Sequence, residues 1–395
     1  LEYHQLYDIY SDYDGVVNLK AVNDAAGGAP VVVDRKIIDL LLFCRDLCEG
    51  TGGQVNAALG GVLALWHDAR EAGISDPASA ALPDAAALAE AARHADFSSV
   101  IIDEAASTVQ ITDPALRLDD PARSLEELRA YRAAGGGFLA DAQPVAAGRD
   151  AERLGALSRE SGVAVAASTG YHLLGFYPAD CWVHSLDEEG LYDLYCGELL
   201  EGMLPWRPEP DRRPAQPTAF RAGLVKAAIP AEGAEGRYAV LLRAAARAAV
   251  RCGVPLMLHT ERGENTLPAL ELCFRAGLTP ERLIVCHVDR QAADFGPHDA
   301  IAATGVYLDY DTIGRFKYHS DEEEVALLRH MCERGYTQRL LLSLDTTAQR
   351  MAAYGGEISL CYLLERFLPR LEAAGFPPGT LADFTVLNCR RLFAG

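Results

Sequence analysis

Seven short apolar segments alternate with helix-like stretches after residue 120, and this alternation constrains the fold more than any other feature. The candidate strands lie at residues 137–145, 162–171, 222–229, 254–260, 283–289, 305–311 and 339–345. Alternation of this kind predicts parallel βαβ units, which occur in doubly wound sheets and in barrels. Polar residues recur at the carboxyl ends of these strands, where barrel enzymes place their chemistry. We therefore expect an α/β fold, an incomplete TIM (β/α)8 barrel of about seven strands, because seven strands do not close an eight-stranded barrel.

The first 119 residues have a different pattern. Residues 37–49 and 62–72 are predicted to be helices, and two strands are predicted around a turn at residues 103–107. No linker rich in Gly, Ser or Pro separates this part from the rest at Asp119–Asp120. We expect two domains, an α+β segment at residues 1–119 and the barrel at residues 120–395.

Charge and cysteine usage limit the partners and the compartment. The formal net charge of −20 repels nucleic acid and anionic lipid, so neither is an expected partner. No apolar run approaches the roughly 18 residues that a membrane span needs. Ten cysteines occur singly with no CxxC pair, which favours free thiols in the cytoplasm. The oligomeric state is left open, with a homodimer as the candidate assembly.

The polar residues at the strand ends suggest a metal site. They are Lys226, His259, His287, Asp309 or Asp311, and Asp345. Each has an ordinary explanation by itself, such as a core histidine, a structural ion pair or a helix cap. Histidines ending two consecutive strands, with a carboxylate from a later strand, form together the ligand set of a hydrolytic divalent metal such as zinc.

Residues 120–395 resemble the phosphotriesterase-related branch of the amidohydrolase superfamily. The matching stretches are GGGFLADAQPVAAGRD, RAGLVKAAI, PLMLHTERGENT, ERLIVCHVDR and LLLSLDTT. The resemblance implies a hydrolase of a phosphoester, lactone or related ester that uses metal-activated hydroxide and one or two divalent ions, zinc above all. It also implies that a carboxylated Lys226 joins the metals, that His259 and His287 hold the more exposed ion, and that Asp345 ligates the buried ion and accepts the proton of the attacking water.

The chain departs from that family at its first strand. The family's His-x-His pair is absent, because no two of the ten histidines are separated by a single residue. Residues 1–119 instead resemble the start of the ApbE-type FAD:protein FMN transferases, carried by YHQLYDIYSDYDGVVNLKAVNDAAGGAPVVVD, GQVNAALGGVLALWHDAR and VIIDEAASTVQITDPALRLD. That family's Lys-Gly-Tyr flavin motif does not follow, so we expect no flavin-binding residue and no flavin.

Three functions remain open. The leading one is an impaired phosphotriesterase-like hydrolase; its rivals are a catalytically inert fusion or binding module, and FMN transfer to a protein threonine by the N-terminal part, which the missing motif disfavours. Substrate contacts are expected from Tyr171, His172, Arg315 and Tyr318, which follow strands, and residues 177–219 are expected to form a lid or an interface. Residues 321–324 are expected to be the charged first turn of a helix capped by Ser320. An element from residues 100–119, most directly 109–113 or 115–119, is expected to lie in or near the place of the missing strand, because open sheet edges bind other chains.

Overall fold

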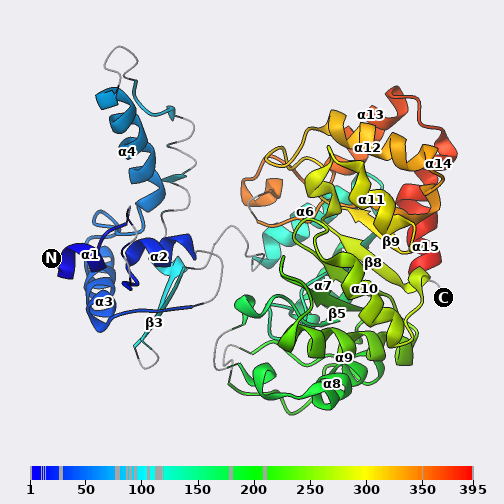
Figure 1. Ribbon diagram of the computed structural model, residues 1–395, viewed down its shortest axis with the longest axis horizontal. Helices are drawn as coiled ribbons and strands as arrows, with labels where there is room; N and C mark the ends of the chain where they lie inside the picture. The colour runs from blue at the N-terminus through cyan, green and yellow to red at the C-terminus, as the bar shows by residue number, and fades with distance from the viewer. Residues whose placement is uncertain are drawn as a thin grey trace. The chain divides into compact units, whose positions relative to one another are not determined.

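A computed structural model (Figure 1) describes most of the chain. It describes every residue except 1, 10, 12, 14, 26–29, 76–80, 86–87, 89–90, 93–94, 96, 105–106, 112–117, 119, 178–180, 208–210, 349 and 394–395. The chain divides into two units, Leu1–Arg117 and Leu118–Gly395, and each is described by itself. No helix in the described part of the chain has both the length and the apolar character that crossing a bilayer requires.

The N-terminal unit is built on a small antiparallel sheet in the order β1-β3-β2. The strands are β1 (Val31–Val32), β2 (Val100–Asp103) and β3 (Thr108–Ile111). The helices are α1 (Glu2–Leu6), α2 (Leu19–Asp24), α3 (Arg35–Gly50) and α4 (Gly60–Ser75). Ile37 and Ile38 of α3 pack with Val109 of β3 in one buried cluster. The predicted helices at residues 37–49 and 62–72 and the predicted hairpin are confirmed.

The C-terminal unit is a parallel seven-stranded sheet in the order β10-β9-β8-β7-β6-β5-β4, so every strand lies beside its neighbour in the sequence. Figure 1 shows the sheet curled, with helices alongside it. The strands are β4 (Phe138–Asp141), β5 (Ala164–Gly170), β6 (Leu224–Ala228), β7 (Leu256–His259), β8 (Leu283–Cys286), β9 (Tyr307–Tyr310) and β10 (Leu340–Leu342). Each lies inside a predicted segment. The incomplete seven-stranded TIM barrel is confirmed.

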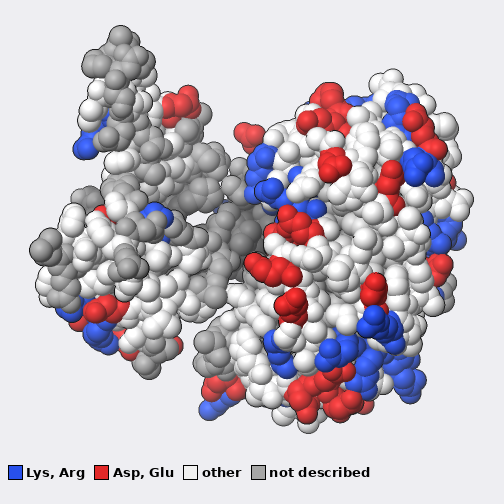
Figure 2. Space-filling view, in the orientation of Figure 1, with Lys and Arg blue, Asp and Glu red and all other residues white. Residues whose placement is uncertain are grey.

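Helices of this unit cover the sheet, and several begin and end as the sequence predicts. They are α6 (Pro121–Ala133), α7 (Ala151–Ser161), α8 (Glu188–Leu200), α9 (Gly236–Cys252), α10 (Thr266–Arg275), α11 (Phe295–Ala302), α12 (Asp321–Glu333), α13 (Leu368–Ala373), α14 (Pro378–Ala382) and α15 (Asn388–Phe393). Gly162 and Gly253 end α7 and α9 in the left-handed conformation. Ser320 caps α12 in a capping box with Glu323, as predicted. On the face drawn in Figure 2, acidic and basic side chains of this unit are interspersed, so the net charge is not gathered into one acidic patch there.

Part of the long segment after β5 packs into the core of the unit. Within residues 177–219, α8 packs against α9 through buried Leu191, Leu194 and Tyr195. Glu198 of α8 and Arg149 form an ion pair at 2.6 Å in which both side chains are 1% exposed. The expectation of a lid is therefore wrong for α8, because its apolar face belongs to the core of the unit.

The edge strands β4 and β10 have no second neighbouring strand among the described residues. The prediction that an element from residues 100–119 fills this place is wrong for residues 108–111, because β3 pairs with β1 and β2 in the N-terminal sheet. Of the alternative segment, residues 115–119, all but Leu118 lie outside the described residues.

In the C-terminal unit, the first helix and the first strand contact segments that follow the last strand. Glu127 of α6, only 2% exposed, accepts hydrogen bonds from the backbone N–H groups of Ala353 (2.9 Å) and Leu360 (2.8 Å), which follow β10. The ring of Phe393 on α15 lies 5.1 Å from that of Phe138 on β4, centroid to centroid. The first helix of the unit is thus bound to the segment after its last strand, and the C-terminal helix packs beside edge strand β4.

Candidate metal centre

Lys226 lies on strand β6, between β5 and β7, with 3% of its surface exposed. Its carbonyl oxygen accepts a hydrogen bond from Tyr171 N at 3.0 Å. Gly170, at the end of β5, has φ +105°, and a Cβ there would lie 1.9 Å from that carbonyl oxygen. Only glycine allows this approach, so Gly170 fixes how β5 and β6 meet at Lys226.

His259 and His287 come together at the ends of two adjacent strands. His259 is the last residue of β7, and His287 directly follows β8. His259 Nδ1 and His287 Nε2 face each other at 2.8 Å, and both residues are buried. The structure therefore brings together the two histidines that the sequence singled out.

Asp311 orients His287. One oxygen of its carboxylate lies 2.7 Å from His287 Nδ1, and the other accepts a hydrogen bond from the backbone N–H of His287 at 3.2 Å. His287 also has φ +68°, which is uncommon for a residue with a side chain. A carboxylate that accepts the Nδ1 proton leaves Nε2 of His287 as the ligating nitrogen.

Asp345, after β10, is the fourth predicted residue of this site. Arg315 Nη1 donates to its carboxylate at 2.5 Å, and Arg290 Nη2 lies 3.9 Å away. Burial would raise the pKa of Asp345, but His287, which is protonated in the acidic range where Asp345 titrates, and the charges of Arg315 and Arg290 outweigh this and hold the pKa well below its usual range. Asp345 is therefore an ionised carboxylate at neutral pH. We call Lys226, His259, His287 and Asp345 the mouth cluster.

The mouth cluster suits a divalent metal. Burial, with a smaller contribution from the charge of Lys226, lowers the pKa of both His259 and His287 to about 3. Both are therefore neutral at pH 7, the form that ligates metal. Zn–N bonds of about 2.0–2.1 Å place two tetrahedral nitrogen ligands roughly 3.3 Å apart. The observed 2.8 Å needs only a small adjustment to reach this separation.

The four predicted substrate contacts have different positions. His172 lies beside the mouth, with its ring centroid 5.3 Å from that of His259. Arg315 pairs with Asp345, and the Tyr318 ring lies 5.3 Å from the Arg315 guanidinium. Tyr171 has none of its side chain exposed and belongs to the hydrophobic core, so its position does not favour substrate contact.

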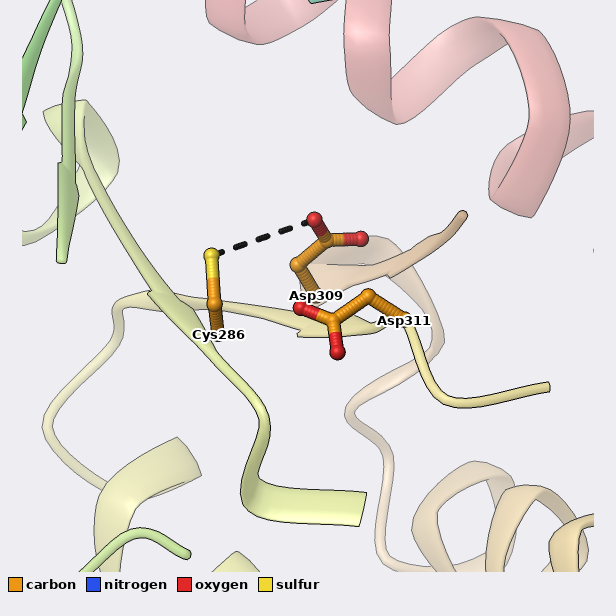
Figure 3. A group of neighbouring side chains, drawn as sticks. All are labelled: Cys286, Asp309 and Asp311. Carbon is orange, nitrogen blue, oxygen red and sulfur yellow. Dashed lines mark hydrogen bonds between the residues drawn. The ribbon is translucent and has the colours of Figure 1, made fainter. Parts of the chain in front are cut away.

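A second group of ligand types lies on the adjacent strands (Figure 3). Cys286 Sγ, Asp309 and Asp311 are buried, with ligand atoms within 4.8 Å of one another. Figure 3 shows Cys286 and Asp309 turned toward each other, and Cys286 Sγ lies 4.0 Å from Asp309 Oδ2. Burial and the charge of Asp311 raise the pKa of Asp309 to about 8. Asp309 does not contact His287, so of the two aspartates considered from the sequence, Asp311 is the partner of the histidine pair.

A comparison with known families decides which family this fold and site represent. Residues 99–393 match the model of the phosphotriesterase family. The chain belongs to the phosphotriesterase family. Residues 1–122 match the model of the ApbE family, in agreement with the resemblance seen in the sequence.

Relatives of this phosphotriesterase-family chain include several hydrolases. A phospho-furanose lactonase of Mycoplasmopsis synoviae is 26% identical over 69% of this chain and 79% of its own length. An N-acetyltaurine hydrolase of Danio rerio is 27% identical, over 67% of this chain and 75% of its own. The phosphotriesterase homology protein of Escherichia coli, solved with phosphate in its active site, has a TM-score of 0.62 and 27% identity, and the match covers 70% of this chain and 91% of that one. The barrel unit therefore belongs to a family of hydrolases. These relatives act on different substrates, so they do not identify the substrate of this chain.

Sequence reasoning missed two residues around the mouth cluster. Glu261 lies 3.3 Å from His259 Nε2 through its carboxylate, and Arg290 donates to Glu261 and lies near Asp345. Glu261 lies two residues after His259, and Arg290 lies three residues after His287. Counting charged residues in the loops after the strands, as well as the strand ends, would have found them.

Proposed function

We propose that the C-terminal unit is a metal-dependent hydrolase of a phosphoester, lactone or related ester. The observation that carries this proposal is the pair of buried, neutral imidazoles of His259 and His287, whose nitrogens converge at 2.8 Å beside an ionised Asp345. This arrangement combines the ligands of a hydrolytic metal with a base that is available at neutral pH.

His259 and His287 would hold the ion, together with Lys226 after its carboxylation. An unmodified lysine is a cation that repels a metal, so binding by Lys226 requires carboxylation and hence bicarbonate. When bound, a divalent ion such as zinc polarises the substrate oxygen and activates water. Without a His-x-His pair, a second ion at this mouth would have only the lysine carbamate and Asp345, and we propose low turnover for this reason.

The remaining groups of the mouth bind and orient the substrate. Asp345 is ionised and accepts a proton from water, while Arg315 keeps it in place. Leu173 N donates to His172 Nδ1 at 2.7 Å, so the ring proton of His172 is on Nε2 and can be donated to a substrate oxygen. Arg290 and Arg315 bring two positive charges to this region, which favours an ester or lactone that carries an anionic group.

The test is hydrolysis by metal-reloaded protein in bicarbonate, with a phosphate-bearing lactone, a neutral lactone and a phosphoester. We expect turnover that is lost in Asp345→Asn with metal retained, and lost together with metal in His259→Ala. A folded wild-type protein that binds no zinc even with bicarbonate would reject the hydrolase and leave the inert binding module. Flavin retained through purification would instead favour the transferase function of the N-terminal unit.

A further inference from the structure

Three buried side chains of metal-binding types lie outside the mouth cluster. Asp289 is in the 3-10 helix η7 (Val288–Gln291), His319 precedes α12, and Glu324 is in the first turn of α12. Their ligand atoms lie within 4.8 Å of one another. Asp289 and Glu324 are 0% exposed, and His319 is 6% exposed. We call these residues the inner cluster.

The carboxylates of the inner cluster are incompletely paired. Asp289 Oδ2 accepts a hydrogen bond from Thr312 N at 2.6 Å. Asp289 Oδ1 and both oxygens of Glu324 have no hydrogen-bond partner among the described residues. Buried polar atoms are nearly always satisfied, because an unpaired one costs about 1–3 kcal/mol or more when charged. Three such oxygens, on two side chains whose ligand atoms lie within 4.8 Å of each other, call for a ligand that the protein does not supply.

His319 is oriented as a metal ligand. Its Nδ1 lies 3.1 Å from the carbonyl oxygen of Ser320, so it donates its proton there. Nε2 then accepts a hydrogen bond from the Thr312 hydroxyl at 2.9 Å and lies 3.4 Å from Glu324 Oε2. A backbone carbonyl that accepts one ring proton while the other nitrogen faces carboxylates is the usual environment of a metal-bound histidine.

Positive charge is scarce around this cluster. Among the described residues, the one ion-pair partner of Glu324 is His319. No described arginine or lysine forms an ion pair with Asp289. A neutral His319 leaves two carboxylates with no cation, and a protonated one leaves a charge unbalanced. Buried carboxylates without a cation are costly, so a bound cation would relieve both the charge and the missing contacts.

We propose that Asp289, His319 and Glu324 bind a divalent cation such as zinc, in a closed structural site separate from the mouth cluster. One imidazole and two carboxylates suit zinc or manganese, and Thr312 Oγ1 or a water would complete four-coordination. Ligand atoms within 4.8 Å must close to about 3.3 Å, a movement of around an ångström. Because Asp289 lies two residues after His287, and Thr312 follows Asp311, an ion here fixes both loops that orient the histidine pair. This inference does not depend on the hydrolase function.

The experiment counts ions in the full chain with Co²⁺ and Zn²⁺ as probes. A variant with a disabled mouth, Lys226→Met with His259→Ala, is stripped with chelator, reloaded without bicarbonate and assayed for bound metal and for the metal-induced rise in melting temperature. Glu324→Gln is then added in this background. The matched control is Glu322→Gln, which removes an exposed carboxylate from the same helical turn. Asp289→Asn, which keeps an oxygen for Thr312 N, is the second test variant, and circular dichroism checks that each variant folds.

We expect the mouth-disabled protein to bind one ion, with visible Co²⁺ absorption, and Glu324→Gln and Asp289→Asn to weaken its affinity at least about 100-fold because a direct ligand is lost. Glu322→Gln should leave affinity within threefold. A folded mouth-disabled protein that binds no ion overturns the proposal, as does one whose ion is unaffected by both Glu324→Gln and Asp289→Asn. Wild-type protein that keeps only the inner ion would contradict the hydrolase function and support the inner site.

Discussion

Replacing Asp311 by Asn tests how the mouth cluster would hold the proposed metal ion. In the folded protein, one carboxylate oxygen accepts the Nδ1 proton of His287 at 2.7 Å and the other accepts its backbone N–H at 3.2 Å. An asparagine can keep one acceptor, but its NH₂ group then faces a backbone N–H, and the negative charge that makes the imidazole a better ligand is lost. Removing such a partner of a metal-bound histidine weakens metal affinity about 10–100-fold, which is roughly 1.4–2.7 kcal/mol.

The assay is a competition titration of Zn²⁺ against a chromophoric chelator in bicarbonate, in the Glu324→Gln background so that only the mouth ion is counted. Asp309→Asn is the matched control, because Asp309 lies on β9 two residues before Asp311 but contacts Ser343 and Cys286 rather than His287. We expect Asp311→Asn alone to lose affinity. An Asp311→Asn protein within threefold of its parent would refute the proposed role of this carboxylate, and equal losses in both variants would point to a general effect of charge.

Three further predictions concern stability. Glu198→Ala leaves the Arg149 guanidinium buried without its carboxylate, so chemical denaturation should show a loss of about 3–5 kcal/mol in the free energy of unfolding; a loss under 1 kcal/mol would contradict this. Gly170→Ala should cost about 1–3 kcal/mol from its backbone conformation alone, plus the clash with the Lys226 carbonyl, and a melting temperature equal to wild type would show that the strands can separate there. Burial raises the pKa of both Asp309 and Asp311 to about 8, so the folded state keeps protons that the unfolded state releases near pH 4; the melting temperature of metal-free protein should fall from pH 6.5 to 8, and Asp309→Asn should make this fall less steep.

The strands and the histidine pair could be predicted from the sequence because local pattern determines them. An apolar run such as the one that ends at His259 is a buried strand wherever it lies, and parallel strands bring their carboxyl ends to one edge. That the carboxyl ends of β7 and β8 meet can therefore be predicted without any knowledge of distant contacts.

Contacts between distant segments could not be predicted in this way. Residues 321–324 have the composition of an exposed helical turn, yet Glu324 is fully buried because α12 lies against the loops that carry Asp289 and His319. The connection of Glu127 to the segment after β10 joins positions more than two hundred residues apart, and nothing in the local sequence indicates it. Periodicity predicts which residues form an element, whereas the partners of a buried charge depend on tertiary packing.

The left-handed backbones of His287 and Asp345 have a consequence for how this chain changes over time. A residue with a side chain costs about 1 kcal/mol or more in that conformation, whereas glycine adopts it freely. At both positions a change to glycine would therefore relax the backbone and remove the proposed metal ligand, His287, or the proposed base, Asp345. Under selection for stability alone, substitutions to glycine or asparagine would accumulate at these two sites. Selection for the proposed metal-dependent activity would instead retain the histidine and the aspartate. Close homologues that share the chain's two-part organisation would show which pressure has acted, since the two pressures predict different residues at the same two codons.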